Sequence, residues 1–186
     1  MKRTYLAAIC LLLATTCKAQ GNKPFPELKL FDNFYGKMAL DEHGTLPADT
    51  NLIAIWKMKE DADPHNYFVV ERRDYNDFVA TYMNRSGSNR TYENFTAFFS
   101  KVGNIDVINV IFRDYDAHIE GYFFLKVISI EKGGWGMTLA LVDDPELKNI
   151  ADRSALRDRM AKDISNPKYC KNPVHFRKIL PLMYCK

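Results

Sequence analysis

The sequence predicts a mainly β protein: an antiparallel up-and-down meander that curls into a barrel or half-barrel of about eight strands, with one short N-terminal helix and one or two short C-terminal helices. Two observations lead to this prediction. Two runs rich in Ile, Val, Phe and Tyr, residues 105–113 and 121–130, are joined by a short polar connection, as in a strand-turn-strand hairpin. Shorter runs with turn residues between them precede and follow this hairpin. Consecutive strands joined by short turns protect their edges best when the sheet curls.

Residues 1–19 have the features of a signal peptide. A basic start, Lys2-Arg3, precedes an apolar run that is too short to span a bilayer, and Cys17-Lys18-Ala19 is a small-x-small ending. We expect cleavage after Ala19 and export to the periplasm or the extracellular space. The alternative is a lipoprotein anchored through Cys17, but the three residues before this cysteine match the usual lipoprotein processing site poorly.

Charge and length limit the partners and the number of domains. The formal net charge is +3, and the unbalanced positive charges are Lys2, Arg3 and Lys18 of the leader, so that 23 of the 26 basic residues remain against 23 acidic ones. This balance argues against a nucleic-acid partner or an anionic membrane, both of which favour a one-sided basic surface. No later run is apolar enough for a transmembrane helix. The remaining chain fits a single β domain over 52–186 with a C-terminal helical cover, preceded by a helix and loop over 20–51.

Cys170 and Cys185 are the two cysteines that remain after the leader. In an exported chain such a pair most simply forms a disulfide, which would close a loop of about 16 residues and stabilise the fold by about 3 kcal/mol. A redox or metal-binding pair is the alternative, but these two residues lack the short Cys-x-x-Cys spacing and neighbouring ligands. We therefore predict a bridge that fastens the last strand and the tail to the domain.

Before the sheet, apolar residues recur at near-helical spacing and predict a short amphipathic helix over 27–40. These residues are Leu28, Phe31, Tyr35 and Met38. Gly36 lies inside the segment and weakens the prediction. A loop that contains Gly44 and Pro47 leads from there to the first strand.

Eight runs of alternating or continuous apolar character predict the strands. In chain order they are 52–59, 67–73, 78–83, 92–102, 105–113, 121–130, 137–142 and 174–180. The segments between them contain turn formers. Gly103-Asn104 predicts a tight turn, residues 131–136 (EKGGWG) predict another hairpin turn, and residues 85–90 (RSGSNR) predict an exposed turn.

The strand over 121–130 has two apolar faces. Because side chains alternate along a strand, Phe123, Leu125 and Val127 should point into the core, and Tyr122, Phe124 and Lys126 should point the other way. Lys126 cannot be buried without a partner, so its face must be the wetter one. That face is nevertheless too apolar to remain exposed. We therefore expect another element to cover it.

The expected cover is a C-terminal helix. Ser154 is a suitable N-cap, and the helix should continue to Ile164 with Leu156, Met160 and Ile164 on one face. Before it, Asp143-Asp144-Pro145 ends a strand and can start another short helix, since Pro is tolerated in a first turn and acids suit its N-terminus.

Several loose motifs run along the domain. They are an early strand with a Trp (Ala54-Ile55-Trp56), a second strand that begins at Tyr67, the F-x-A-x-F pattern from Phe95 to Phe99, and the strand MTLALVDD followed by a short helix and a terminal HFRKI. Together they resemble the layout of lipocalin-like (calycin-like) secreted proteins and lipoproteins of bacteria. The likeness covers about residues 52–180, although Ala54 stands where a lipocalin has the Gly of its Gly-x-Trp motif. It implies a small barrel and brings no assigned activity.

Two functions follow from such a barrel. Inward side chains could line an apolar pocket for a small hydrophobic ligand or lipid, and the candidates are Trp56, Phe68, Phe95, Phe99, Phe123 and Leu125. The same side chains could instead fill the barrel, so that the protein acts through its surface as an envelope interaction or structural component. The interior volume distinguishes the two, because a ligand pocket usually measures several hundred cubic ångströms.

Few residues suggest metal binding or catalysis. Asp114, Asp116 and His118 alternate in the polar connection of the central hairpin, so an extended chain would place them on one side, where they could bind a cation. A solvated connection explains them more simply, since no further ligand is identifiable. The chain has no Gly-x-Ser-x-Gly motif and no phosphate-binding glycine loop. We therefore expect neither an enzyme nor a cofactor.

Overall fold

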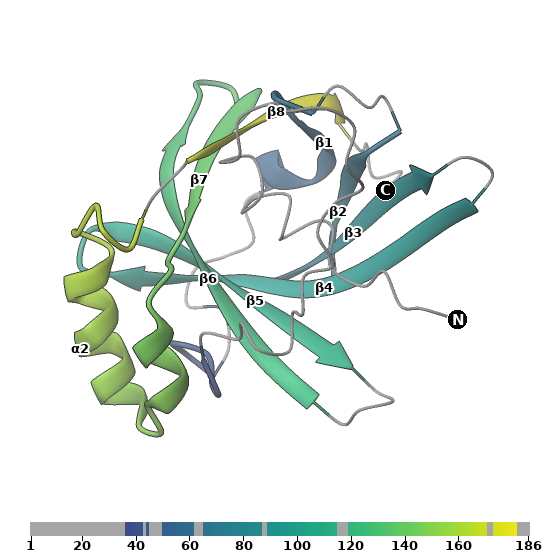
Figure 1. The fold of residues 1–186 in the computed structure, drawn as a ribbon. Helices are drawn as coiled ribbons and strands as arrows, with labels where there is room; N and C mark the ends of the chain where they lie inside the picture. Colours follow the sequence, from purple (N-terminus) through teal and green to yellow (C-terminus); the bar gives the residue numbers. More distant parts are fainter. Residues whose placement is uncertain are drawn as a thin grey trace, which may run out of the picture.

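The strands follow one another around a barrel in chain order, and the last strand pairs with the first (Figure 1). The computed structural model describes residues 36–42, 44, 50–61, 65–86, 89–114, 119–170 and 173–181. Within these residues, the strands are β1 (Ala54–Met58), β2 (Tyr67–Arg72), β3 (Asp77–Ser86), β4 (Asn89–Val102), β5 (Ile105–Asp114), β6 (Ile119–Ile130), β7 (Gly136–Leu141) and β8 (Val174–Pro181). Every neighbouring pair is antiparallel. The predicted up-and-down barrel is confirmed, in its closed form.

Three short helical segments accompany the described strands. They are η2 (Thr50–Leu52) before β1, and η3 (Pro145–Asn149) and α2 (Arg153–Asp163) between β7 and β8. The helix predicted to start at Asp143-Asp144-Pro145 is confirmed as η3, whose N-cap Asp144 accepts a hydrogen bond from the Glu146 amide at 3.0 Å.

The N-cap predicted for the second helix is wrong by two residues. Asp152, not Ser154, caps α2, and its Oδ1 accepts a hydrogen bond from the Ala155 amide at 2.8 Å. Both residue types cap helices well, but a carboxylate also complements the positive end of the helix dipole. Ser154 consequently lies in the first turn of the helix.

The N-terminal helix predicted over 27–40 is wrong for residues 36–40, which are not helical, while residues 27–35 lie outside the described chain. Gly36 instead forms a bridge with β6, in which the Tyr122 amide donates to the Gly36 carbonyl oxygen at 3.2 Å. A Cβ atom on Gly36 would lie 3.0 Å from the Phe124 ring, which leaves little room for any other residue. Pairing with a strand therefore replaces the helical turn here.

Two of the hairpin turns predicted from glycines are present as expected, and the third is shorter than predicted. Gly103 has φ of +60°, and Val102 pairs with Ile105 across it, which confirms the tight turn. Gly133 and Gly134 have φ of +82° and +66° between β6 and β7. The turn predicted over 85–90 is shorter than expected, because β3 and β4 remain paired as far as Ser86 and Asn89.

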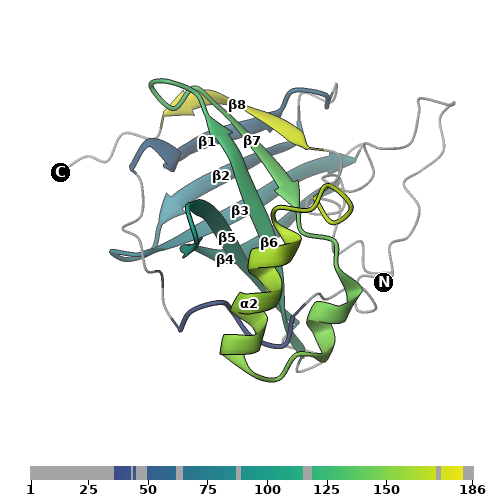
Figure 2. The same ribbon diagram turned by 90° about the vertical axis from the view of Figure 1, so that its left-hand side faces the viewer.

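The two faces predicted for β6 are confirmed as far as Val127, whereas Ile128 and Ile130 beyond it are not covered and remain 46% and 40% exposed. Phe123 and Leu125 belong to the cluster inside the barrel, and Phe124 belongs to a second cluster outside it. The helix α2 lies across the outside of β6 (Figure 2). Its fully buried Leu156, Met160 and Ile164 pack in this second cluster. Each such side chain stabilises the fold by roughly 1.5–3 kcal/mol when it leaves water.

The segment over residues 36–42 crosses the same outer face and is fastened by a buried amide. Asn109 of β5 has no exposed surface, and its Oδ1 accepts from the Leu40 amide at 2.9 Å while its Nδ2 donates to Ser100 Oγ at 2.8 Å. Arg157 of α2 donates to the Leu40 carbonyl oxygen at 3.4 Å. The strand, the crossing segment and the helix are thus joined in one outer layer.

Candidate ligand cavity

The barrel interior holds an apolar cavity next to η2. The cavity is lined by one residue of η2 and by residues of all eight strands: Leu52, Trp56, Phe68, Val70, Phe78, Ala80, Phe95, Ala97, Phe99, Ile108, Val110, Leu125, Met137, Leu139 and Phe176. The cavity has a volume of about 100 Å³. The interior is thus neither fully packed nor a wide pocket.

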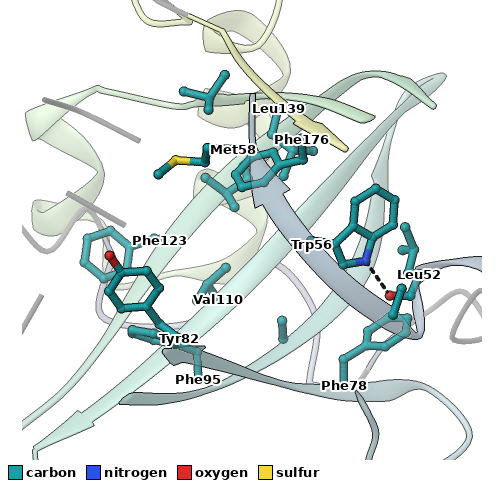
Figure 3. Packing of buried hydrophobic residues seen from close by; sticks show 14 of the residues in the cluster. Leu52, Trp56, Met58, Phe78, Tyr82, Phe95, Val110, Phe123, Leu139 and Phe176 are labelled. Atoms are coloured by element: carbon teal, nitrogen blue, oxygen red, sulfur yellow. Dashed lines mark hydrogen bonds between the residues drawn. The ribbon is translucent and has the colours of Figure 1, made fainter. Parts of the chain in front are cut away.

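None of the lining side chains offers a free polar atom to the cavity. The one nitrogen among them, Trp56 Nε1, donates to the Leu52 carbonyl oxygen at 2.8 Å (Figure 3). The aromatic rings meet edge to face: Phe78 and Phe99 lie 5.8 Å apart at 76°, and Phe68 and Phe176 lie 5.8 Å apart at 76°. Such contacts contribute about 0.5–1.5 kcal/mol beyond burial, so the rings hold defined positions.

Small residues on β3 and β4 create part of the space. Ala97 pairs with Phe78, and Ala80 pairs with Phe95. Residues that pair directly across two strands point to the same face, so two alanines and two phenylalanines alternate on this wall. The alanine side chains end at one carbon atom, where their neighbours extend as rings.

A lysine from the last strand closes the barrel beside η2. Lys178 lies opposite Trp56 in the β1–β8 pairing, and its Nζ donates to the Asn51 carbonyl oxygen at 2.5 Å. The same ammonium lies 5.3 Å from the Trp56 ring centre and 5.8 Å from that of Trp135. Cation–π contacts of this kind contribute about 0.5–2 kcal/mol. The end of the barrel is therefore fastened by β8, η2 and the β6–β7 turn together.

Five of the six predicted pocket residues line the cavity: Trp56, Phe68, Phe95, Phe99 and Leu125. The sixth, Phe123, points into the same interior cluster and has no exposed surface, but it is not among the lining residues. It therefore belongs to the packed part of the interior.

Sequence reasoning named none of the other ten lining residues as pocket residues. Phe78 and Ala80 alternate at the start of a predicted strand, and Phe176 lies in the closing strand, so alternation alone could have added them. The importance of Ala80 and Ala97 depends on which residues face them across the strands. That information comes from the register, which the sequence does not state.

A charged cluster lies outside the barrel, between η3 and α2. Arg159 Nη2 is 2.6 Å from Asp144 Oδ2, and Arg159 Nε is 3.2 Å from Asp163 Oδ1. Both carboxylates are buried, whereas Arg159 is partly exposed. Burial, followed by the neighbouring Asp144, raises the pKa of Asp163 to about 6, although Arg159 opposes the shift. One guanidinium thus serves two buried carboxyl groups.

The metal-site hypothesis remains untested. Asp114 is the last residue of β5, and Asp116 and His118 lie outside the described residues. In the described part of the chain, no three His, Cys, Asp or Glu side chains are placed to hold a metal ion. Across the same described ranges, no helix has the length and apolar character needed to cross a membrane.

The disulfide also remains a prediction, because Cys185 lies outside the described residues. Cys170 is half-buried near the end of α2, where its Sγ is 3.6 Å from the Asp163 carbonyl oxygen, and burial raises the pKa of its thiol.

Comparison with known proteins identifies no relative: no protein-family model, no curated protein and no solved structure matches the chain. The candidate site must therefore be interpreted from its own geometry. That geometry consists of an apolar space inside the barrel and, outside the barrel, the charged cluster of Arg159, Asp144 and Asp163.

Proposed function

We propose that this protein binds a small, uncharged, apolar molecule inside its barrel. The observation that carries the proposal is the cavity lining, which comes from η2 and all eight strands and contains only apolar side chains. Moving an apolar molecule from water into such surroundings is favourable by about 25 cal/mol per Å² of buried surface. The site suits binding better than catalysis, because none of its lining residues is titratable.

The cavity volume limits the ligand. An engineered cavity of about 150 Å³ lined by similar side chains binds benzene or xenon. The present cavity, at about 100 Å³, is of this order. A lipid tail would need movement of the surrounding rings, so we favour a compact ligand over a long-chain one.

We also propose that the protein is exported and that it is lipocalin-like. Export is supported by the basic start and apolar run of residues 1–19, and a lipocalin-like relationship is supported by the barrel layout with its early Trp56. Mass spectrometry of the N-terminal peptide of the purified mature protein tests the proposed export. A chain that begins at Gln20 without a fatty acid supports simple secretion, and a diacylglyceryl group on Cys17 would show a lipoprotein.

The alternative is a protein that acts through its surface. Apolar side chains are exposed near the η2 end of the barrel, where the Lys178 amide pairs with the Trp135 carbonyl oxygen. Trp135 is 56% exposed, Ile179 48% and Leu180 54%. Exposed aromatic residues are common at interfaces. In this alternative the interior would serve only as a core.

A titration with apolar probes separates the two roles. The purified protein is titrated with benzene, naphthalene and hexane while amide NMR signals are followed. Ligand binding predicts saturable shifts in β3 and β4 around the cavity, and native mass spectrometry should reveal any co-purified ligand. If no probe causes saturable shifts and no adduct is found, the binding proposal is wrong and the surface role is favoured.

A further inference from the structure

We infer that Ala80 and Ala97 determine which ligand the cavity accepts, and that this ligand is a hydrocarbon of one aromatic ring without hydrogen-bonding groups. The inference rests on the binding function proposed above. Ala80 and Ala97 set the largest ligand size that the cavity accepts, and the apolar lining as a whole excludes polar ligands.

The size limit follows from the register of three strand pairs. Ala80 lies between Val70 of β2 and Phe95 of β4, and Ala97 lies between Phe78 of β3 and Val110 of β5. All six of these residues line the cavity. Each alanine is therefore flanked by longer side chains on both neighbouring strands, and the space above it is open to a ligand. A larger residue at either position would occupy that space directly.

The chemical selectivity follows from the polar atoms, which are all engaged elsewhere. Trp56 Nε1 is bonded to the Leu52 carbonyl oxygen, and the nearby Lys178 ammonium is bonded to the Asn51 carbonyl oxygen. A hydroxyl group brought into the cavity would lose its water partners and gain none. An unpaired buried polar group costs about 1–3 kcal/mol, which corresponds to roughly a 5- to 150-fold loss of affinity. The cavity should therefore discriminate strongly against polar analogues of the same size.

The preference for an aromatic ring follows from the wall itself. The rings of Trp56, Phe68, Phe78, Phe95, Phe99 and Phe176 belong to the lining, and two pairs of them already meet edge to face. A planar ring can extend this arrangement, since ring edges are positive and ring faces negative. A volume near that of a benzene-binding cavity leaves space for one ring and not for two.

The test compares toluene with phenol, which have nearly the same shape but differ in one hydroxyl group. Wild-type protein should bind toluene at least about fivefold more tightly than phenol. Ala80→Leu and Ala97→Leu should each weaken toluene binding at least about 10-fold, because leucine adds three carbon atoms and a single methylene in a filled pocket already changes affinity by about 10- to 200-fold. Ala161→Leu, on the exposed side of α2, is the matched control and should bind as wild type does. Ala97→Ser adds one hydroxyl to the wall and should narrow the preference for toluene over phenol to a few-fold.

The outcomes distinguish this inference from the proposed function. If naphthalene or hexane binds but toluene does not, or if both leucine variants bind toluene as wild type does, the inference is wrong and the binding function stands. If no apolar probe binds at all, both are wrong. Thermal unfolding of each variant shows whether it is folded. Three variants at two positions test the inference. If one of them does not fold, the remaining variants still give a result.

Discussion

Lys126 on the outer face of β6 donates from its Nζ to the carbonyl oxygen of Ile164, the C-cap residue of α2, at 2.7 Å. This contact solves the problem posed by an apolar strand face that also carries a lysine. The aliphatic part of the side chain lies among apolar neighbours, while the ammonium meets the negative end of a helix dipole. The helix that covers the face therefore also supplies the partner for its charge.

Replacing Lys126 with Met should loosen the end of α2. The substitution keeps a long apolar side chain but removes the donor, so the free energy of unfolding should fall by about 1–2 kcal/mol. Lys162→Met, an exposed lysine in the last turn of the same helix, is the control and should change stability by less than ~0.5 kcal/mol. Urea unfolding measures both. Equal effects of the two substitutions would mean that the Ile164 contact contributes nothing specific.

Phe123 and Phe99 should respond differently to truncation. Phe123 is fully buried and lies outside the cavity lining, so Phe123→Ala should cost about 3–5 kcal/mol. Phe99 already borders empty space and makes fewer contacts on that side, so Phe99→Ala should cost less. Chemical denaturation of the two variants checks the order. A cost below about 1 kcal/mol for Phe123→Ala would place its ring in the open cavity instead.

The strands and the outer cover could be predicted because they depend on local patterns. Alternation along residues 121–130 separates Phe123 from Phe124, and Lys126 identifies the wetter face. The segment around Gly36 could not be predicted in this way. Its apolar spacing favours a helix, but its backbone pairs with Tyr122, a residue far away in the sequence. Long-range pairing thus overrides a local preference.

The free energy of unfolding should depend on pH through the titration of Asp163. The pKa of this residue in the folded protein is raised to about 6, so folding favours its protonated form. The resulting stabilisation is complete below about pH 4 and is lost as the pH rises through about 6. Asp163→Asn remains neutral and leaves Arg159 paired with Asp144 alone. At pH 8 this variant should therefore be more stable than wild type by about 1–3 kcal/mol, and at pH 4 the difference should be small.

The control for Asp163→Asn is the same substitution at an exposed aspartate. Asp158→Asn changes an exposed residue of the same helix and should leave the pH profile of wild type intact. Urea unfolding of the three proteins from pH 4 to pH 8 gives the differences. A constant difference between Asp163→Asn and wild type across this range would show that Asp163 does not titrate within it.

Thiol labelling tests the predicted disulfide. If Cys170 and Cys185 are bridged, the denatured and unreduced protein should take up no maleimide at either cysteine. Stoichiometric labelling of Cys170 without reductant would show a free thiol. Such a thiol should react slowly in the folded protein, because burial raises its pKa.

The candidate site could be predicted only in part. Trp56, Phe95 and Phe99 are recognisable as inward residues from alternation, but nothing local shows that space remains between them. The space depends on Ala80 and Ala97 facing larger residues on adjacent strands. A sequence states the size of each side chain, whereas a cavity is a property of several side chains from distant parts of the chain.

The seam between β1 and β8 has a consequence for how the chain reaches its native state. The seam joins the first strand to the last, and the Lys178–Asn51 contact beside it spans 127 residues. Until β8 has been synthesised, β1 and β7 each present an unpaired edge that another chain can join. Contacts so distant in sequence also form slowly, because a long loop must close first. A chain that stops before Val174 should accordingly aggregate, whereas a chain that contains β8 can close the barrel and pair both edges.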